Sequence, residues 1–153
     1  MSKRTFRATL GAMAVVLATA GVGWLGVGAA SAAGGPHIVV TPHLRLHNHE
    51  VVRVHGSGFK PGDSVYIVEC LRNAKGQGQC YVPMSLGALP KAVTITASGT
   101  LPVTRFIVRT GKIGSGVCGT TRVNLARCDV SVGNATGGDS TSFPITFVLP
   151  RKK

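Results

Sequence analysis

The spacing of hydrophobic residues in the second part of the chain predicts β-strands rather than helices. Runs rich in valine, isoleucine and phenylalanine alternate with short segments that contain glycine or proline. Several runs repeat every second residue, so that Phe143, Ile145, Phe147 and Leu149 would share one face of a strand. We expect strands at residues 37–41, 51–56, 64–70, 91–96, 101–109, 127–133 and 142–149. Short strands separated by turn signals are typical of an antiparallel β-sandwich.

The segment GSGFKPG at residues 56–62 has the glycine content of a phosphate-binding loop. Such a loop binds phosphate because it leads into a helix, whose first N–H groups face the anion. Here the glycines lead into SVYIVEC, which has the pattern of a strand, and Lys60 precedes the turn pair Pro61-Gly62. We therefore expect this segment to connect two strands and not to bind a nucleotide.

Residues 1–32 have the organisation of a secretory signal peptide. Lys3, Arg4 and Arg7 precede an uncharged stretch rich in alanine, valine and leucine, which ends at Ala30-Ser31-Ala32. Small residues at both ends of this tripeptide suit a signal peptidase. A retained membrane anchor is the alternative, but the abundance of glycine and alanine disfavours membrane insertion. We expect cleavage after Ala32, secretion, and a mature domain at 33–153 with a short basic tail at 151–153.

The charge of the chain limits the kind of partner. The full sequence has a net charge of +12, and residues 33–153 alone carry fourteen basic and five acidic residues, or +9. A basic surface of this kind favours anionic partners such as DNA, a cell-wall glycopolymer or a membrane surface, without selecting one of them. The length of about 120 residues suits one domain with a single core.

The four cysteines indicate two disulfides, because a small exported domain folds in an oxidising compartment. Three pairings are possible. The equal short spacings favour the local pairs, Cys70 with Cys80 and Cys118 with Cys128. Zinc binding is less consistent with the sequence, which contains no C-x-x-C knuckle.

The five histidines all lie between residues 37 and 55, which raises the question of a metal site. His47 and His49 precede an expected strand and should lie in a turn, and His55 alternates with Val54 and should face solvent. We favour surface histidines over a metal site.

The sequence contains no recognisable catalytic set. It has no G-x-S-x-G motif, no cysteine outside the expected disulfides, and few acidic residues to form a catalytic pair. An enzyme is therefore disfavoured.

The order of these features resembles the neocarzinostatin family of enediyne-antibiotic apoproteins. The resemblance rests on TPHL, followed by VVRVHGSGFKPGDSVYIVEC, the two short cysteine loops, DVSVGNATGG after Cys128 and I-T-F at 145–147. It covers essentially the whole of residues 33–153. It implies a seven-stranded immunoglobulin-like sandwich with two short disulfide loops, and a cleft that holds a DNA-damaging chromophore.

The resemblance implies a non-enzymatic carrier that binds and protects a small molecule without covalent linkage. No stable protein partner and no other cofactor are expected. In this chain Arg72 stands where some members of the family place a tryptophan, and the cleft walls should carry four basic residues and one aromatic: Arg72, Arg105, Arg109, Lys112 and Phe106. Such walls would favour an anionic or polyphenolic ligand. The alternative is a secreted binding module for anionic polymers that carries no chromophore.

Overall fold

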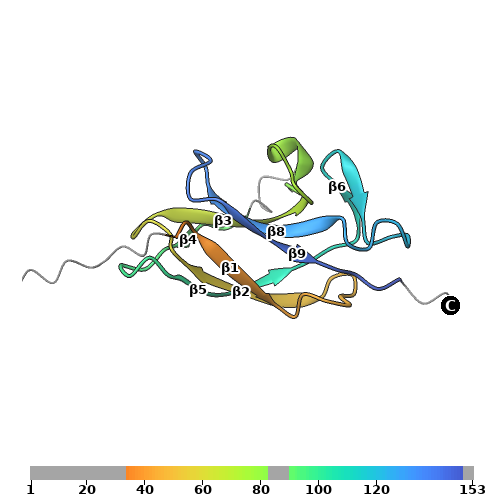
Figure 1. Ribbon diagram of the computed structural model, residues 1–153, viewed down its shortest axis with the longest axis horizontal. Coiled ribbons are helices and arrows are strands. Elements are labelled where there is room, and N and C mark those ends of the chain that lie inside the picture. The colour runs from red at the N-terminus through yellow and green to blue at the C-terminus, as the bar shows by residue number, and fades with distance from the viewer. Residues whose placement is uncertain (1–33, 83–89, 150–153) are drawn as a thin grey trace, which may run out of the picture. The chain divides into compact units, whose positions relative to one another are not determined.

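The computed structural model describes residues 34–82 and 90–149, which form an antiparallel β-sandwich. The expected signal peptide at 1–32 and the basic tail at 151–153 lie outside the described residues. Figure 1 shows the two main sheets as facing layers. Among the described residues, no helix has the length and apolar character needed to cross a membrane.

The first layer is a three-stranded sheet whose middle strand is β2. Its spatial order is β1 (His37–Thr41), β2 (Val51–Ser57) and β5 (Leu101–Ile107). Both pairings are antiparallel, and the register between β2 and β5 shifts between Val54 and Gly56. Among the described strands β5 has a hydrogen-bonded neighbour on one side only, so its other edge lies at the side of the sandwich.

The second layer is a four-stranded sheet in which β3 and β8 are central. Its order is β4 (Val93–Thr94), β3 (Ser64–Leu71), β8 (Cys128–Asn134) and β9 (Thr141–Ile145). The strand β4 is short and pairs only with Ser64 and Val65 of β3. Most of β3 therefore has no β4 residue beside it, and the sheet is narrower there.

The core lies between the two layers and follows the alternation of the strands. In β2, Val52 and Val54 are fully buried while Arg53 and His55 are exposed. On the opposite layer the inward side chains come from alternate positions of β3, β8 and β9, namely Val65, Ile67, Val130, Val132 and Ile145. Apolar burial of this kind contributes roughly 25 cal/mol per Å² and is the main stabilisation of the domain.

The strand predictions were confirmed in kind but not in number. All seven expected segments contain a strand, and GSGFKPG connects β2 to β3 as predicted. The described residues contain two further strands, β6 (Gly111–Ile113) and β7 (Gly116–Cys118), which form a hairpin. The sequence does not predict these two strands, because three-residue strands beside glycines have too short an alternation to recognise.

Candidate functional site

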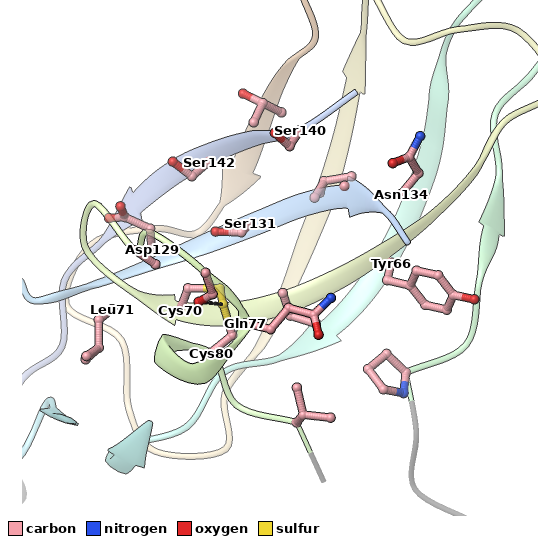
Figure 2. Close-up of a pocket in the computed structure, with 18 of the residues that line it drawn as sticks. Tyr66, Cys70, Leu71, Gln77, Cys80, Asp129, Ser131, Asn134, Ser140 and Ser142 are labelled. Atoms are coloured by element: carbon pink, nitrogen blue, oxygen red, sulfur yellow. Dashed lines mark hydrogen bonds between the residues drawn. A yellow bond between two sulfur atoms is a disulfide. The ribbon is translucent and has the colours of Figure 1, made fainter. Parts of the chain in front are cut away.

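The larger candidate site lies on the outer face of the four-stranded sheet. Here a cavity of about 510 Å³ is lined by β3, β8 and β9 and by the loop that follows β3. Figure 2 shows its labelled side chains, including Tyr66 from β3, Ser131 from β8 and Gln77 from the loop. We call it the sheet-face cavity. Its volume lies in the range of about 300–1,000 Å³ that is usual for small-molecule sites.

The floor of the sheet-face cavity is made of side chains that point away from the core. Along β8, Val130 and Val132 are buried, so the alternate residues Asp129, Ser131 and Gly133 line the cavity side. Ser131 and Gly133 are small and therefore leave space above the sheet. The floor thus offers the hydroxyl group of Ser131 for hydrogen bonding beside the apolar side chain of Val68.

One wall of the sheet-face cavity is held by a disulfide. Cys70 at the end of β3 is bonded to Cys80, and the intervening loop contains the short helix η1 (Gln77–Gln79). Cys118 and Cys128 form the second disulfide, so the favoured local pairing was confirmed. The first disulfide fixes the loop to the strand that forms the floor, and it thereby reduces the movement of the wall relative to the floor.

The β6–β7 hairpin packs closely against this loop. Gly114, at the hairpin turn, has a φ of 50°, and a Cβ atom built there would lie 2.7 Å from Cα of Gln79. A Cβ on Gly116 would lie 2.6 Å from a methyl group of Leu71. Glycine is therefore required for the hairpin to approach the loop closely.

A second cavity, of about 390 Å³, lies at the side of the sandwich between β3 and the free edge of β5. We call it the edge cavity. Three of the five residues that we predicted for the cleft line it, namely Arg105, Phe106 and Arg109. Tyr81 is also in its wall, and the guanidinium carbon of Arg109 lies 5.0 Å from the centre of the Tyr81 ring. This distance allows a cation–π interaction.

The other two predicted residues lie elsewhere. Arg72 donates a hydrogen bond of 3.1 Å from Nε to Oδ1 of Asp129, at the sheet-face cavity. Lys112 lies in β6 and is not among the described residues that line either cavity. The expected grouping of five residues is therefore divided: three line the edge cavity, Arg72 binds a residue of the sheet-face cavity without itself lining it, and Lys112 lies in the hairpin.

Glu69 is the acidic residue in the wall of the edge cavity, and it is 1% exposed. Its Oε2 accepts a hydrogen bond of 2.8 Å from the backbone N–H of Arg109, while Oε1 has no partner among the described residues. Burial raises the pKa of Glu69 from its ordinary value of 4.5 to about 7, against the opposing effects of this hydrogen bond and the Arg109 charge. The carboxyl group is therefore partly neutral near pH 7.

The histidines are dispersed at the surface. His47 and His49 lie at the turn before β2, and His55 is exposed, as predicted. His43 is half-buried and packs edge-on against Phe143, with 5.2 Å between ring centres. The group of potential metal ligands found among the described residues consists of Glu69, Cys118 and Cys128, and its two sulfur atoms are joined in a disulfide.

The sequence analysis missed the floor of the sheet-face cavity. A usable signal was present in DVSVGN, where inward Val130 and Val132 imply that Ser131 and Gly133 face outward. Two small residues on the outer face of a central strand, next to a disulfide loop, predict a hollow. Glu69 shares the inward face of β3 with Val65 and Ile67, and the sequence alone does not show which face of that strand is inward.

Comparisons with known proteins agree with this fold. The model of the neocarzinostatin family matches residues 38–147. Among solved structures, the chain is similar to macromomycin, with 25% sequence identity and a TM-score of 0.51 over 74% of this chain and 99% of that one. It is also similar to apokedarcidin in its solution conformation, with 26% identity and a TM-score of 0.48 over 75% of this chain and 100% of that one. A search of curated protein sequences found no match.

The family match extends from β1 to the residues just after β9 and therefore includes both main sheets, both disulfides and both cavities. The sequence resemblance, the sandwich and the family model thus agree over the same residues. The chain belongs to the neocarzinostatin family.

Proposed function

We propose that this protein is a secreted, non-enzymatic carrier that binds a small-molecule chromophore in the sheet-face cavity. The observation that carries the proposal is a cavity of about 510 Å³ built on the outer face of a central sheet. Membership of the neocarzinostatin family supports it, because the family resemblance implies apoproteins that hold a chromophore without covalent linkage.

The form of the cavity indicates what it can bind. Its floor combines the hydroxyl group of Ser131 with the apolar surface of Val68, so it suits a largely apolar molecule with a few hydrogen-bonding groups. The Arg72–Asp129 ion pair places charge at one end. Because the floor belongs to a sheet and the loop wall is cross-linked, little conformational freedom needs to be lost on binding.

Secretion forms part of the same proposal. It is supported by the signal-peptide pattern of residues 1–32 and by two disulfides, which persist in oxidising compartments. The carrier role assigns no covalent chemistry to the protein, and the chromophore would supply any DNA damage.

Native mass spectrometry of the protein secreted by its own host, kept cold and dark, tests the carrier function. We expect a reproducible excess mass of small-molecule size, which disappears when the protein is denatured. A bare mass, lower by four hydrogens than that of the reduced mature chain, would confirm both disulfides but contradict the presence of a bound chromophore.

A second candidate function is binding to an anionic polymer, and one observation favours it. On the outer face of the three-stranded sheet, the exposed residues Arg53 and Arg105 are directly paired in register across β2 and β5. None of the three strands contains an acidic residue. Like charges opposite one another destabilise a sheet unless an anion lies near them.

The salt dependence of binding to a DNA duplex tests this candidate. A polyanion-binding surface should lose affinity steeply between about 50 and about 200 mM salt, since each neutralised phosphate releases counterions. The double variant Arg53→Gln with Arg105→Gln should reduce the slope. Binding that does not change with salt, or an unchanged slope in the variant, would contradict it.

A further inference from the structure

We propose that the edge cavity is a second binding site, specific for a planar aromatic carboxylate. This inference does not depend on the carrier function of the sheet-face cavity. It rests on how the two sheets end, on the charges around the opening and on the aromatic groups in the wall.

The cavity lies where two sheet edges face each other and no strand of residues 34–82 or 90–149 lies between them. The short β4 pairs only with Ser64 and Val65, and the next contact on this side of β3 is the hydrogen bond from Tyr81 N–H to the carbonyl oxygen of Glu69, at 2.7 Å. Opposite lies β5, the edge strand of the other sheet. In the part of the chain that the structure describes, the side of the sandwich is open over residues 67–69, and the cavity of about 390 Å³ occupies this opening.

Three cations line the opening: Lys91, Arg105 and Arg109. None of them has a carboxylate partner within salt-bridge distance in the described part of the chain. The acidic residue in the wall, Glu69, offsets these charges only in part near pH 7, because its carboxyl group is buried and its pKa is raised to about 7. The opening is thus positively charged and favours an anion.

The inner wall favours a flat apolar body. Phe106 and Tyr81 are both half-buried against the core cluster, and Ile67 and Val93 lie beside them. The guanidinium group of Arg109, placed over the Tyr81 ring, joins the aromatic wall to the charged opening. A guanidinium group binds a carboxylate through two parallel hydrogen bonds, so a carboxylate fits better than a single-atom anion.

The edge cavity has a different environment from the sheet-face cavity. The two share Val68 and Pro90 in their walls, but the sheet-face cavity is completed by β8 and β9 and the edge cavity by β5. The floor around Ser131 is formed by β8, which does not line the edge cavity. The two sites should therefore select different molecules.

Titration of the isotope-labelled protein with cinnamate, followed by NMR, tests the proposal. We expect saturable one-to-one binding, with shifts in the amide signals of Phe106, Tyr81 and Arg109. Cinnamamide has the same planar body without the charge. Its affinity should be lower by about tenfold or more, as expected when charge-assisted hydrogen bonds are lost. Equal affinity for the two probes, or no saturation by cinnamate, would overturn the proposal.

Matched variants identify the residues responsible. Arg109→Gln keeps the backbone N–H that Glu69 requires and should weaken cinnamate binding about tenfold. Arg105→Gln should also weaken it, whereas Arg53→Gln, at the paired position in β2 but outside the cavity wall, should have little effect. If Arg53→Gln and Arg105→Gln lowered the affinity for cinnamate equally, the attraction would be non-specific and the proposed site would be wrong. Amide signal shifts confined to Ser131 and Gly133 would also contradict the proposal.

Discussion

Glu69 and Arg109 are joined by a hydrogen bond of 2.8 Å between a buried carboxylate oxygen and a backbone N–H. The bond connects β3 of one sheet to the segment that follows β5 of the other. Because the carboxyl group is 1% exposed and Oε1 has no partner among the described residues, its negative form is costly inside the domain.

This arrangement predicts that stability falls as the pH rises. The folded-state pKa of Glu69, about 7, lies above its ordinary value of 4.5. The contribution of Glu69 to the stability of the folded state is therefore fully present below about pH 4.5 and is lost as the pH rises through 7. In thermal or denaturant unfolding, Glu69→Gln should have a higher free energy of unfolding than the native chain at about pH 8, by on the order of 2 kcal/mol. The difference between the two proteins should be smallest at about pH 4. A stability difference that does not change with pH would refute the assignment.

The two disulfides should differ in their effect. Replacement of Cys70 and Cys80 by alanine releases the loop wall, and we expect faster hydrogen exchange at residues 71–80 with little change in β2 and β5. Closing a loop of this length is worth on the order of 2–3 kcal/mol. Cys118 and Cys128 are both fully buried in the core cluster, so their replacement should lower global stability more. Unchanged exchange at 71–80 in the first variant would show that the loop is held by other contacts.

Gly114→Ala should disturb the support of the sheet-face cavity. The new methyl group would collide with the backbone of Gly78 and Gln79 and would also occupy a left-handed backbone conformation. Gly62→Ala is the matched control, because Gly62 has a φ of 77° but nothing within 4 Å of a built Cβ. The control should lose about 1–2 kcal/mol through backbone strain alone, and Gly114→Ala should lose more. Equal losses would show that the close approach is unimportant.

A double-mutant cycle can measure the coupling between Arg72 and Asp129, which form an ion pair. Asp129 is nearly buried, with 8% of its side chain exposed, and Arg72 is 38% exposed. Removal of Arg72 alone leaves the carboxylate without its partner and should cost roughly 1 kcal/mol, since solvent screens the more exposed group. Arg72→Met combined with Asp129→Asn should recover most of the loss. Strictly additive effects in urea unfolding would indicate that the pair is not coupled.

The sequence predicted the sandwich well because its strands alternate strongly. In β2 the apolar Val52 and Val54 alternate with the polar Arg53 and His55, as is typical of a half-buried strand. The equal short cysteine spacings were enough to favour the correct disulfide pairs. The β6–β7 hairpin could not be predicted, because each strand has three residues and only one that is buried, Ile113 or Cys118, which is too short an alternation to recognise.

The site residues were harder to predict than the fold. Arg105, Phe106 and Arg109 are close in sequence and lie in one wall, so local reasoning placed them together. Arg72 and Lys112 belong to other elements, and their positions depend on how the disulfide loop and the hairpin pack. The ion pair of Arg72 with Asp129 joins residues 57 apart in the chain, a relationship that no local pattern contains.

The measurement that tests the carrier function most directly compares two tryptophan variants secreted by the natural host. Ser131→Trp fills the floor of the sheet-face cavity, while Val103→Trp adds the same side chain at a position that is 67% exposed on the other sheet. Thermal unfolding should show a cooperative transition for both variants, which confirms that they are folded. We expect native mass spectrometry to find the small-molecule excess mass on Val103→Trp and on the unmodified chain, but not on Ser131→Trp. An excess mass that remains on folded Ser131→Trp, or none on any of the three, would show that the sheet-face cavity does not hold a chromophore.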